Sequence, residues 1–326
     1  MTLSQTEVTG AEVYTATVAD ELIRRGHEVT IMSDTLATPT LATYVPLELD
    51  KRSFRRRWRY VWFLVRFIRE HQIQMVHAHS RAAMWVSWFA TRIARVPMIS
   101  TIHALEPTHR TRRLIPAFGD YALAVCANAR QNVVENIGFP GSKIEVLRNG
   151  FRLPEHAVPT DVPEEKLITV IGRLTSTKGE ATFQLLENVL QHETEYPVYV
   201  IGGRELPPRF EKFRNRVTFV GHVSGPEVGT WIARSALVIG SGRVAVEALL
   251  LGKKTLAFGA FSSPGLVSEA TLAECLASNF GDISFGGRQY DWAAVKADLQ
   301  AGKTAPAPSK ALIAQVRGAY DLIPVV

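Results

Sequence analysis

The alternation of short apolar runs with longer helical patterns is the feature that most constrains how this chain can fold. Ten apolar runs have the length and composition of strands, and helical patterns separate most neighbouring pairs. The ten runs are residues 27–33, 75–80, 98–103, 121–127, 144–147, 167–174, 198–202, 217–223, 236–240 and 255–259. Such alternation is typical of parallel sheets connected by crossover helices. We therefore predict an α/β protein.

Length and composition indicate two domains. The chain has 326 residues, of which 46% are hydrophobic, enough for two full cores. Residues 152–166 contain three prolines and lack apolar periodicity, which predicts a boundary there. We expect one Rossmann-like domain over 1–155, a second over 156–305, and a C-terminal helix from about Ser309 to Leu322 within 306–326 that could return to the first domain. Only MTLSQ precedes the first helical pattern, so the first strand is either a stub there or missing.

Charge and cysteine content restrict the compartment and the partners. Two cysteines are too few for a disulfide framework, and the sequence lacks a secretory signal and an apolar run long enough to cross a bilayer. These features favour the cytoplasm. The net charge of +6 favours anionic partners such as nucleotides, lipid head groups or nucleic acid.

A glycine-marked turn in the second half has the features of a phosphate-binding loop. After the apolar run 167–171, Gly172 and Arg173 are followed by Lys178 and a helical pattern. A guanidinium and an ammonium that flank one loop suit two phosphate groups. A pair of solvated loop charges would give the same pattern, so this motif alone leaves both interpretations open.

A second turn follows the apolar run that ends at Ile239. Gly240, Ser241 and Gly242 form this turn, and the helix predicted after it can face an anion with its free backbone N–H groups. Glu247 lies about one turn into that helix, where its carboxylate can accept hydrogen bonds from a ribose diol. Together, the two turns predict a nucleotide-diphosphate ligand.

The second turn also matches the G-x-G-x-x-A fingerprint of dinucleotide-binding proteins, from Gly240 to Ala245. That fingerprint needs an acidic residue about 20 positions later, at the end of the next strand. Here the next strand reads KTLAFGA and has none. An NAD enzyme is therefore disfavoured.

Histidines in the first half raise the question of a metal site. His77 and His79 alternate onto one strand face, and His103 and His109 lie on later segments. A zinc site is disfavoured because an HExxH motif, a cysteine pair and a clear carboxylate partner are all missing. His103 could also be a hydrogen-bonded core histidine at a strand end.

The segment KRSFRRRWRYVWFLVRFIRE, residues 51–70, is the most basic part of the chain and has helical periodicity. Its apolar positions are Phe54, Trp58, Val61, Trp62, Val65 and Ile68, and the arginines opposite are Arg55, Arg56, Arg59, Arg66 and Arg69. A basic helix with tryptophans suits an anionic membrane surface, and the contact residues for membrane or acceptor would be Arg55, Arg56, Arg57, Trp58 and Trp62.

Other interpretations of this basic surface stay open. The apolar face could pack on the first sheet and leave the arginines merely solvated. Arg110, Arg112 and Arg113 could extend the surface toward an anionic acceptor, or be solvated loop charges. A nucleic-acid partner is disfavoured because the sequence contains none of the recognised binding motifs.

Several segments, taken in order, resemble retaining glycosyltransferases of family 4. They are TGAEVYTATVADELIRRGHEV, VHAHSRAAMW, ISTIHA and IEVLRNGFR in the first half, and VIGRLTSTKG, VIGG, VTFVGHV and VEALLLGKK in the second. The resemblance covers nearly the whole chain, and the order and spacing are more specific than any single segment. It implies the GT-B architecture of two Rossmann-like domains facing a central cleft. It also implies transfer from a nucleotide-diphosphate sugar with retained anomeric configuration, without a metal or another cofactor.

The resemblance implies roles for residues that would lie near the reacting centre. Gly10 would lie in the turn near the donor phosphates, and His103 would face the transferred sugar. Arg173 and Lys178 would hold the departing diphosphate. Such a reaction depends mainly on stabilising the charge of that diphosphate, which preorganised cations and helix dipoles can do.

The remaining implied roles concern the nucleoside. The backbone around Gly221, His222 and Val223 would line the base pocket, and Glu247 would bind the ribose. Base, sugar and acceptor cannot be deduced from these residues.

One position departs from the family pattern. Family members usually have a further glutamate eight positions before the ribose-binding one, and here that position is Ile239. The sugar hydroxyls would then be held by backbone amides of the turn from Gly240 to Arg243, and Arg243 could add a phosphate contact.

We therefore expect a glycosyltransferase that acts on a lipid-linked or cell-envelope glycan, cytoplasmic and peripheral on the inner face of the membrane. Two alternatives are a non-catalytic scaffold of GT-B type and a nucleotide-sugar epimerase on the same architecture.

Overall fold

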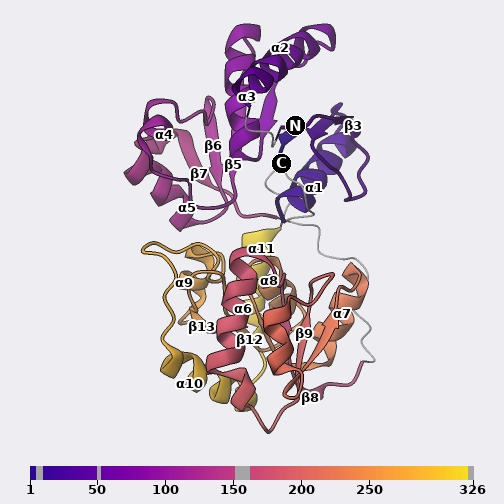
Figure 1. Ribbon diagram of the computed structural model, residues 1–326, viewed down its shortest axis with the longest axis vertical. Helices are drawn as coiled ribbons and strands as arrows, with labels where there is room; N and C mark the ends of the chain where they lie inside the picture. Colours follow the sequence, from indigo (N-terminus) through magenta and orange to yellow (C-terminus); the bar gives the residue numbers. More distant parts are fainter. Residues whose placement is uncertain (5–9, 50–52, 151–161, 322–326) are drawn as a thin grey trace. The chain divides into compact units, whose positions relative to one another are not determined.

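The computed structural model describes residues 1–4, 10–49, 53–150 and 162–321. The chain divides into two compact units, Met1–Leu153 with Tyr320–Val326 and Pro154–Ala319 (Figure 1). Each unit contains one sheet. Most of the proline-rich segment 152–166 lies outside the described residues.

Unit 1 is built on a seven-stranded parallel sheet in the order β3-β2-β1-β4-β5-β6-β7. The strands are β1 (Thr2–Leu3), β2 (Thr30–Ser33), β3 (Thr43–Pro46), β4 (Val76–Ala78), β5 (Met98–Ile102), β6 (Tyr121–Ala124) and β7 (Ile144–Val146). The two-residue β1 lies at the centre, paired with β2 on one side and β4 on the other. MTLSQ therefore contains a strand, although a very short one.

Helices cover both faces of this sheet. They are α1 (Gly10–Arg24), α2 (Phe54–Glu70), α3 (Arg81–Ala94), α4 (Arg110–Leu114), α5 (Ala127–Gln131), the π-helix η1 (Asn132–Ile137) and the 3₁₀ helix η2 (Gly141–Lys143). Helices α2 and α3 lie side by side, and their apolar residues share one core with Met32 and Val76 of the sheet (Figure 1).

The packed face of α2 is narrower than the sequence pattern predicted. Val61, Leu64, Val65 and Ile68 are buried, as helical spacing requires, but Trp62 is 59% exposed. Trp62, predicted as a contact residue for a membrane or acceptor, therefore lies outside the packed face. It lies next to Val61 in the sequence, about 100° around the helix from it, and this rotation carries its ring into solvent.

Unit 2 contains a six-stranded sheet in the order β10-β9-β8-β11-β12-β13, parallel except for the antiparallel edge strand β13. The strands are β8 (Glu165–Ile171), β9 (Val198–Ile201), β10 (Val217–Gly221), β11 (Ser235–Gly240), β12 (Thr255–Ala257) and β13 (Gly265–Leu266). All ten predicted strands are present, most of them shorter than the predicted runs; the short edge strands β3 and β13 were not predicted.

Two apolar cores flank this second sheet. Helices α6 (Ser176–Asn188) and α10 (Trp292–Thr304) pack in one core, and α7 (Gly225–Arg234) and α8 (Arg243–Leu250) pack in the other. The remaining helices of the unit are η3 (Leu190–His192), η4 (Pro208–Phe213), α9 (Leu272–Ala277) and most of α11 (Lys310–Tyr320). The strand order reverses between β8 and β11, which makes the gap beyond their carboxyl ends the expected ligand crevice of a doubly wound sheet.

Candidate functional site

The crevice at the reversal point of the second sheet contains the residues of both predicted turns. Gly172 follows β8, Gly240 ends β11 and Ser241 follows it, while Lys178 and Thr182 come from α6. They line a cavity of about 20 Å³, which holds roughly one water. A nucleotide would therefore have to lie outside this cavity, over the edge of the sheet.

Lys178 belongs to a small polar network in this crevice. Its Nζ donates to Asp282 Oδ2 at 2.7 Å and to Ser241 Oγ at 3.2 Å. Ser241 Oγ donates to Asp282 Oδ1 at 2.8 Å, and the backbone N–H of Ala260 donates to the same oxygen at 3.2 Å. Arg173, expected to work with Lys178, directly follows Gly172 and is exposed. The cation predicted to hold phosphate is thus already paired with a carboxylate.

Close backbone approaches fix this edge of the sheet. A Cβ on Gly179 would lie 2.1 Å from the carbonyl oxygen of Leu174, so only glycine lets α6 pack this close to the loop before it. A Cβ on Gly202 would lie 2.1 Å from the oxygen of Gly172, at a φ of +125°. Gly172 and Gly202 directly follow β8 and β9, so the ends of these two strands approach each other through glycine backbone.

Helix α8 begins at the crevice. Gly242 is its N-cap and has no side chain to cap the first turn. A bound anion could therefore accept hydrogen bonds from the backbone N–H groups of that turn. Glu247 forms an ion pair with Arg243 at 2.6 Å. The two residues predicted to contact ribose and phosphate therefore contact each other one helical turn apart.

The predicted base-pocket residues lie at the same edge, beyond β10. Gly221 ends β10 with a φ of +85°, and its carbonyl oxygen accepts from Gly202 N at 2.8 Å. His222 is exposed and Val223 packs partly into the core under α7. The structure thus brings together the predicted donor residues of the second half along one edge of one sheet.

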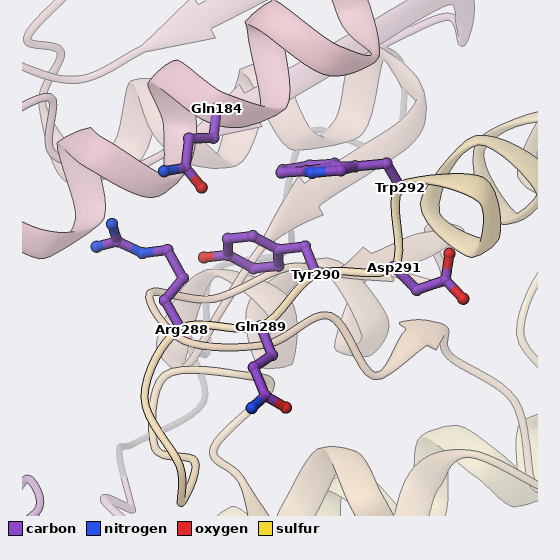
Figure 2. A pocket seen from close by; sticks show the side chains of 6 residues that line it. All are labelled: Gln184, Arg288, Gln289, Tyr290, Asp291 and Trp292. Atoms are coloured by element: carbon purple, nitrogen blue, oxygen red, sulfur yellow. The ribbon is translucent and has the colours of Figure 1, made fainter.

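An open pocket of about 620 Å³ lies near this edge, lined by Gln184 of α6 and by residues 288–292 (Figure 2). Gln184 points from α6 toward the side chains of Arg288 and Tyr290, and the Tyr290 and Trp292 rings lie 5.0 Å apart. Arg288 Nε donates to the oxygen of Ala260 and Tyr290 OH donates to the oxygen of Gly259. These two side chains therefore hold the loop that presents the Ala260 N–H to Asp282.

The two remaining predicted residues lie in unit 1. His103 follows β5, partly buried, with its ring 5.5 Å from that of Tyr14 and its Nε2 3.4 Å from His79 Nδ1. Gly10 is the first residue of α1; it has no positive φ, and a Cβ there would meet nothing within 4 Å. Packing within unit 1 therefore does not explain a glycine at position 10.

Burial keeps the histidine cluster neutral. It lowers the pKa of His77 to about 3 and that of His103 to about 4, and it lowers the pKa of His79 well below its usual value. His77 Nε2 lies 2.7 Å from Thr101 Oγ1 within the same sheet. Among the described residues, no group of three or more His, Cys, Asp or Glu side chains is placed to hold a metal ion.

The arginines after His103 do not all face solvent. Arg112 is buried and forms an ion pair with Glu106 at 2.8 Å, and its guanidinium lies over the Phe118 ring. Burial raises the pKa of Glu106 and lowers that of Arg112. The option that Arg112 extends an exposed basic surface is wrong, because this guanidinium fastens the loop after β5.

Sequence reasoning missed Asp282, Arg288 and Tyr290. They follow no recognised motif and lie more than 100 residues from Lys178, so only the fold brings them to the crevice. One local signal was present: the NFGD run, residues 279–282, has the composition of a turn.

Comparisons with known proteins agree with this architecture. Residues 8–153 match the family model described as Glycosyltransferase Family 4. No curated protein sequence matches the chain. A glycosyltransferase from Rickettsia africae ESF-5 has a similar structure, with a TM-score of 0.70 and 18% identity over 99% of this chain and 94% of that one.

Two further solved structures are similar over 99% of this chain and 96% of their own. Alr3699/HepE from Anabaena, in complex with UDP, has a TM-score of 0.68 at 17% identity. Sucrose-phosphate synthase from Thermosynechococcus elongatus has a TM-score of 0.70 at 14% identity. More distantly, the UDP-GlcNAc 2-epimerase of Methanocaldococcus jannaschii matches at a TM-score of 0.53 and 12% identity.

The fold is therefore that of the GT-B glycosyltransferases, as the sequence predicted. The family model confirms the resemblance to family 4 over residues 8–153, and the structural neighbours show the same fold over nearly the whole chain.

Proposed function

We propose that the protein is a retaining glycosyltransferase that moves a sugar from a nucleotide-diphosphate donor to a glycan or lipid-linked acceptor. The observation that carries this proposal is the crevice at the reversal point of the second sheet, where Gly172, Lys178 and Ser241 meet beside the N-terminus of α8. A cation and the N-terminus of a helix at one place suit a diphosphate. The structure of HepE with UDP, a protein of similar fold, supports a nucleotide sugar as the donor.

In this proposal the donor residues act mainly by electrostatics. Lys178, Arg173 and the first turn of α8 stabilise the negative charge that develops on the departing diphosphate, without a metal ion. His103, kept neutral by its low pKa, faces the transferred sugar as a hydrogen-bonding group rather than a cation. The leaving phosphate helps to deprotonate the acceptor on the same face of the sugar, which retains the configuration.

The test uses Glu247, proposed to bind the ribose. We expect Glu247→Ala to lose about 1.5–3 kcal/mol of affinity for a nucleoside diphosphate, roughly 10- to 150-fold, because a hydrogen bond to a charged group is lost. Isothermal titration with uridine, guanosine and adenosine diphosphates and their sugar conjugates measures this loss and identifies the base.

The matched control is Glu211→Ala, which breaks the exposed ion pair between Glu211 and Arg214 in the same unit. Equal affinity in wild type and Glu247→Ala would remove Glu247 from the donor site. Failure of every nucleotide to bind the wild type would favour the non-catalytic scaffold. Conversion of the donor sugar in the absence of an acceptor would favour the epimerase, whose fold is also similar.

We further propose that α2 brings unit 1 to an anionic membrane that carries the acceptor. Trp62, Phe63 and Phe54 are exposed along this helix, and Arg55 and Arg59 are exposed beside them. Arg57 and Trp58 instead pack inward against Trp85, so they support this surface rather than form it. Among the described residues, no helix is long and apolar enough to cross a bilayer.

A further inference from the structure

The family pattern expects a glutamate at position 239, where this chain has a buried isoleucine. Ile239 lies inside β11, paired with Val170 of β8 and Leu256 of β12. Its side chain is 1% exposed and belongs to the main apolar core of unit 2. A carboxylate at this position would be desolvated by that core, at a cost in free energy.

Another carboxylate reaches the same place from a distant part of the chain. Asp282 accepts from Ser241 Oγ and Ala260 N through Oδ1, and from Lys178 Nζ through Oδ2. Ser241 lies only two residues after Ile239. A carboxylate offers about four acceptor positions, and these three donors leave one, on Oδ2.

The open position on Oδ2 lies beside the start of α8. A Cβ added to Gly242 would lie 3.3 Å from Oδ2 and 3.2 Å from Asn279 Nδ2, so glycine lets the start of α8 approach the carboxylate closely. The Asp282 side chain is 12% exposed, which keeps its geometry fixed while one edge stays accessible.

The backbone that presents Asp282 is strained. Asn279, Phe280 and Gly281 have φ values of +53°, +58° and +91° in succession. A Cβ on Gly281 would lie 2.2 Å from the oxygen of Ser262, and one on Gly259 would lie 2.0 Å from the carbonyl carbon of Gly281. Residues in such conformations persist only where their surroundings hold them, and they concentrate at functional sites.

We propose that Asp282 binds a hydroxyl of the donor sugar and so replaces the glutamate that the family pattern places at position 239. Lys178 has two roles in this arrangement: it neutralises the carboxylate, so that an anionic diphosphate can lie beside it without repulsion, and it contacts the diphosphate itself. This inference rests on the proposed function, because it names a residue for the sugar of the proposed donor.

The experiment separates the sugar from the nucleotide. Dissociation constants for a nucleoside diphosphate and for its hexose conjugate are measured by titration calorimetry on wild type, Asp282→Asn and Asp282→Glu. Asparagine keeps an acceptor for Ser241 and Ala260 but removes the charge, whereas glutamate keeps the charge and displaces it by one methylene. Glu187→Gln is the matched control, since it makes the same chemical change in the surface pair of Glu187 with Lys212.

We expect both Asp282 variants to bind the diphosphate within about threefold of wild type and to bind the sugar conjugate at least tenfold more weakly, while Glu187→Gln changes neither. A tenfold loss corresponds to a hydrogen bond with a charged partner. Thermal unfolding of each variant checks that unit 2 is folded.

Two outcomes would overturn the role of Asp282 alone. In one, the variants keep wild-type affinity for the conjugate; in the other, they lose the diphosphate and the conjugate equally, so that Asp282 only places Lys178. If the wild type binds no nucleotide, the donor site itself is wrong, and the role of Asp282 falls with it.

Discussion

Gly179 shows how a single hydrogen atom in place of a side chain shapes the crevice at the reversal point of the second sheet. It lies in the first turn of α6, and a Cβ there would meet the carbonyl of Leu174 at 2.1 Å. We expect Gly179→Ala to lower the free energy of unfolding of unit 2 by about 1–3 kcal/mol, because backbone rather than a flexible side chain must move. Urea unfolding followed by the fluorescence of Trp231 and Trp292 measures this change.

Gly229, within α7, provides the contrast. A Cβ there meets nothing within 4 Å and the backbone is helical, so Gly229→Ala should stabilise the unit by about 0.5–1 kcal/mol through helix propensity. Equal effects of the two substitutions would show that the contact with Leu174 does not determine the cost.

The buried histidines of unit 1 make its stability depend on pH. The pKa of His77 is about 3 in the folded protein and near 6.5 when unfolded, so the unfolded chain binds more protons between these values. The contribution of the neutral His77 to stability is therefore fully present above about pH 6.5 and is lost as the pH drops toward 3. Lowering the pH from 6.5 to 5.5 should lower the free energy of unfolding by about 1 kcal/mol for each buried histidine.

Denaturant titrations at these two pH values test this expectation. His77→Asn keeps a polar group next to Thr101 but cannot titrate near neutrality, so its loss of stability on acidification should be smaller by about 1 kcal/mol. An unchanged pH dependence would mean that His77 is protonated in the folded state.

At the scale of elements, α2 offers the sharpest prediction. Charge next to an anionic bilayer is worth about 1 kcal/mol per arginine, so Arg55→Ser with Arg59→Ser should weaken binding to vesicles containing phosphatidylserine by roughly thirtyfold. Vesicle sedimentation at low and physiological salt measures binding, which should weaken as salt rises.

The control changes the net charge equally on the other unit. Arg204→Ser with Arg216→Ser removes two exposed arginines far from α2 in the sequence and should leave vesicle binding unchanged. Loss of binding in the control, or failure of the wild type to bind vesicles, would contradict a specific role of α2.

Element prediction succeeded where burial on both faces imposes a continuous apolar run. The central strands β8 and β11 are buried almost throughout, and both were predicted. The edge strands β3 and β13 were missed because β3 is largely exposed and β13 has only two residues, so neither forms an apolar run. Along α2, helical periodicity does not distinguish the exposed Trp62 from Trp58, which packs partly buried against the core, since both fit the width of an amphipathic face.

At the scale of the whole molecule, a bound donor nucleotide should stabilise unit 2 and leave unit 1 unchanged. A ligand at 100 times its dissociation constant adds about 2.7 kcal/mol to the stability of the part that binds it. Hydrogen exchange with saturating nucleotide should therefore slow at the carboxyl ends of β8 and β11, and not across the sheet of unit 1. Protection confined to unit 1 would place the nucleotide elsewhere.

The sequence alone determined the α/β class, ten of the strands, the GT-B architecture and the edge of the second sheet where the predicted donor residues gather. These features depend on patterns within the sequence: the periodicity of apolar residues, the glycine turns and the order of the motifs. Tertiary structure decided what each side chain touches.

Lys178 meets Asp282 across 104 positions, Arg112 is buried against Glu106, and Ile239 lies in the apolar core of unit 2. Pairings of this kind depend on how strands and loops far apart in the sequence are brought to one edge. The periodicity of a single segment carries no information about them, because burial and hydrogen bonding are properties of the assembled sheet.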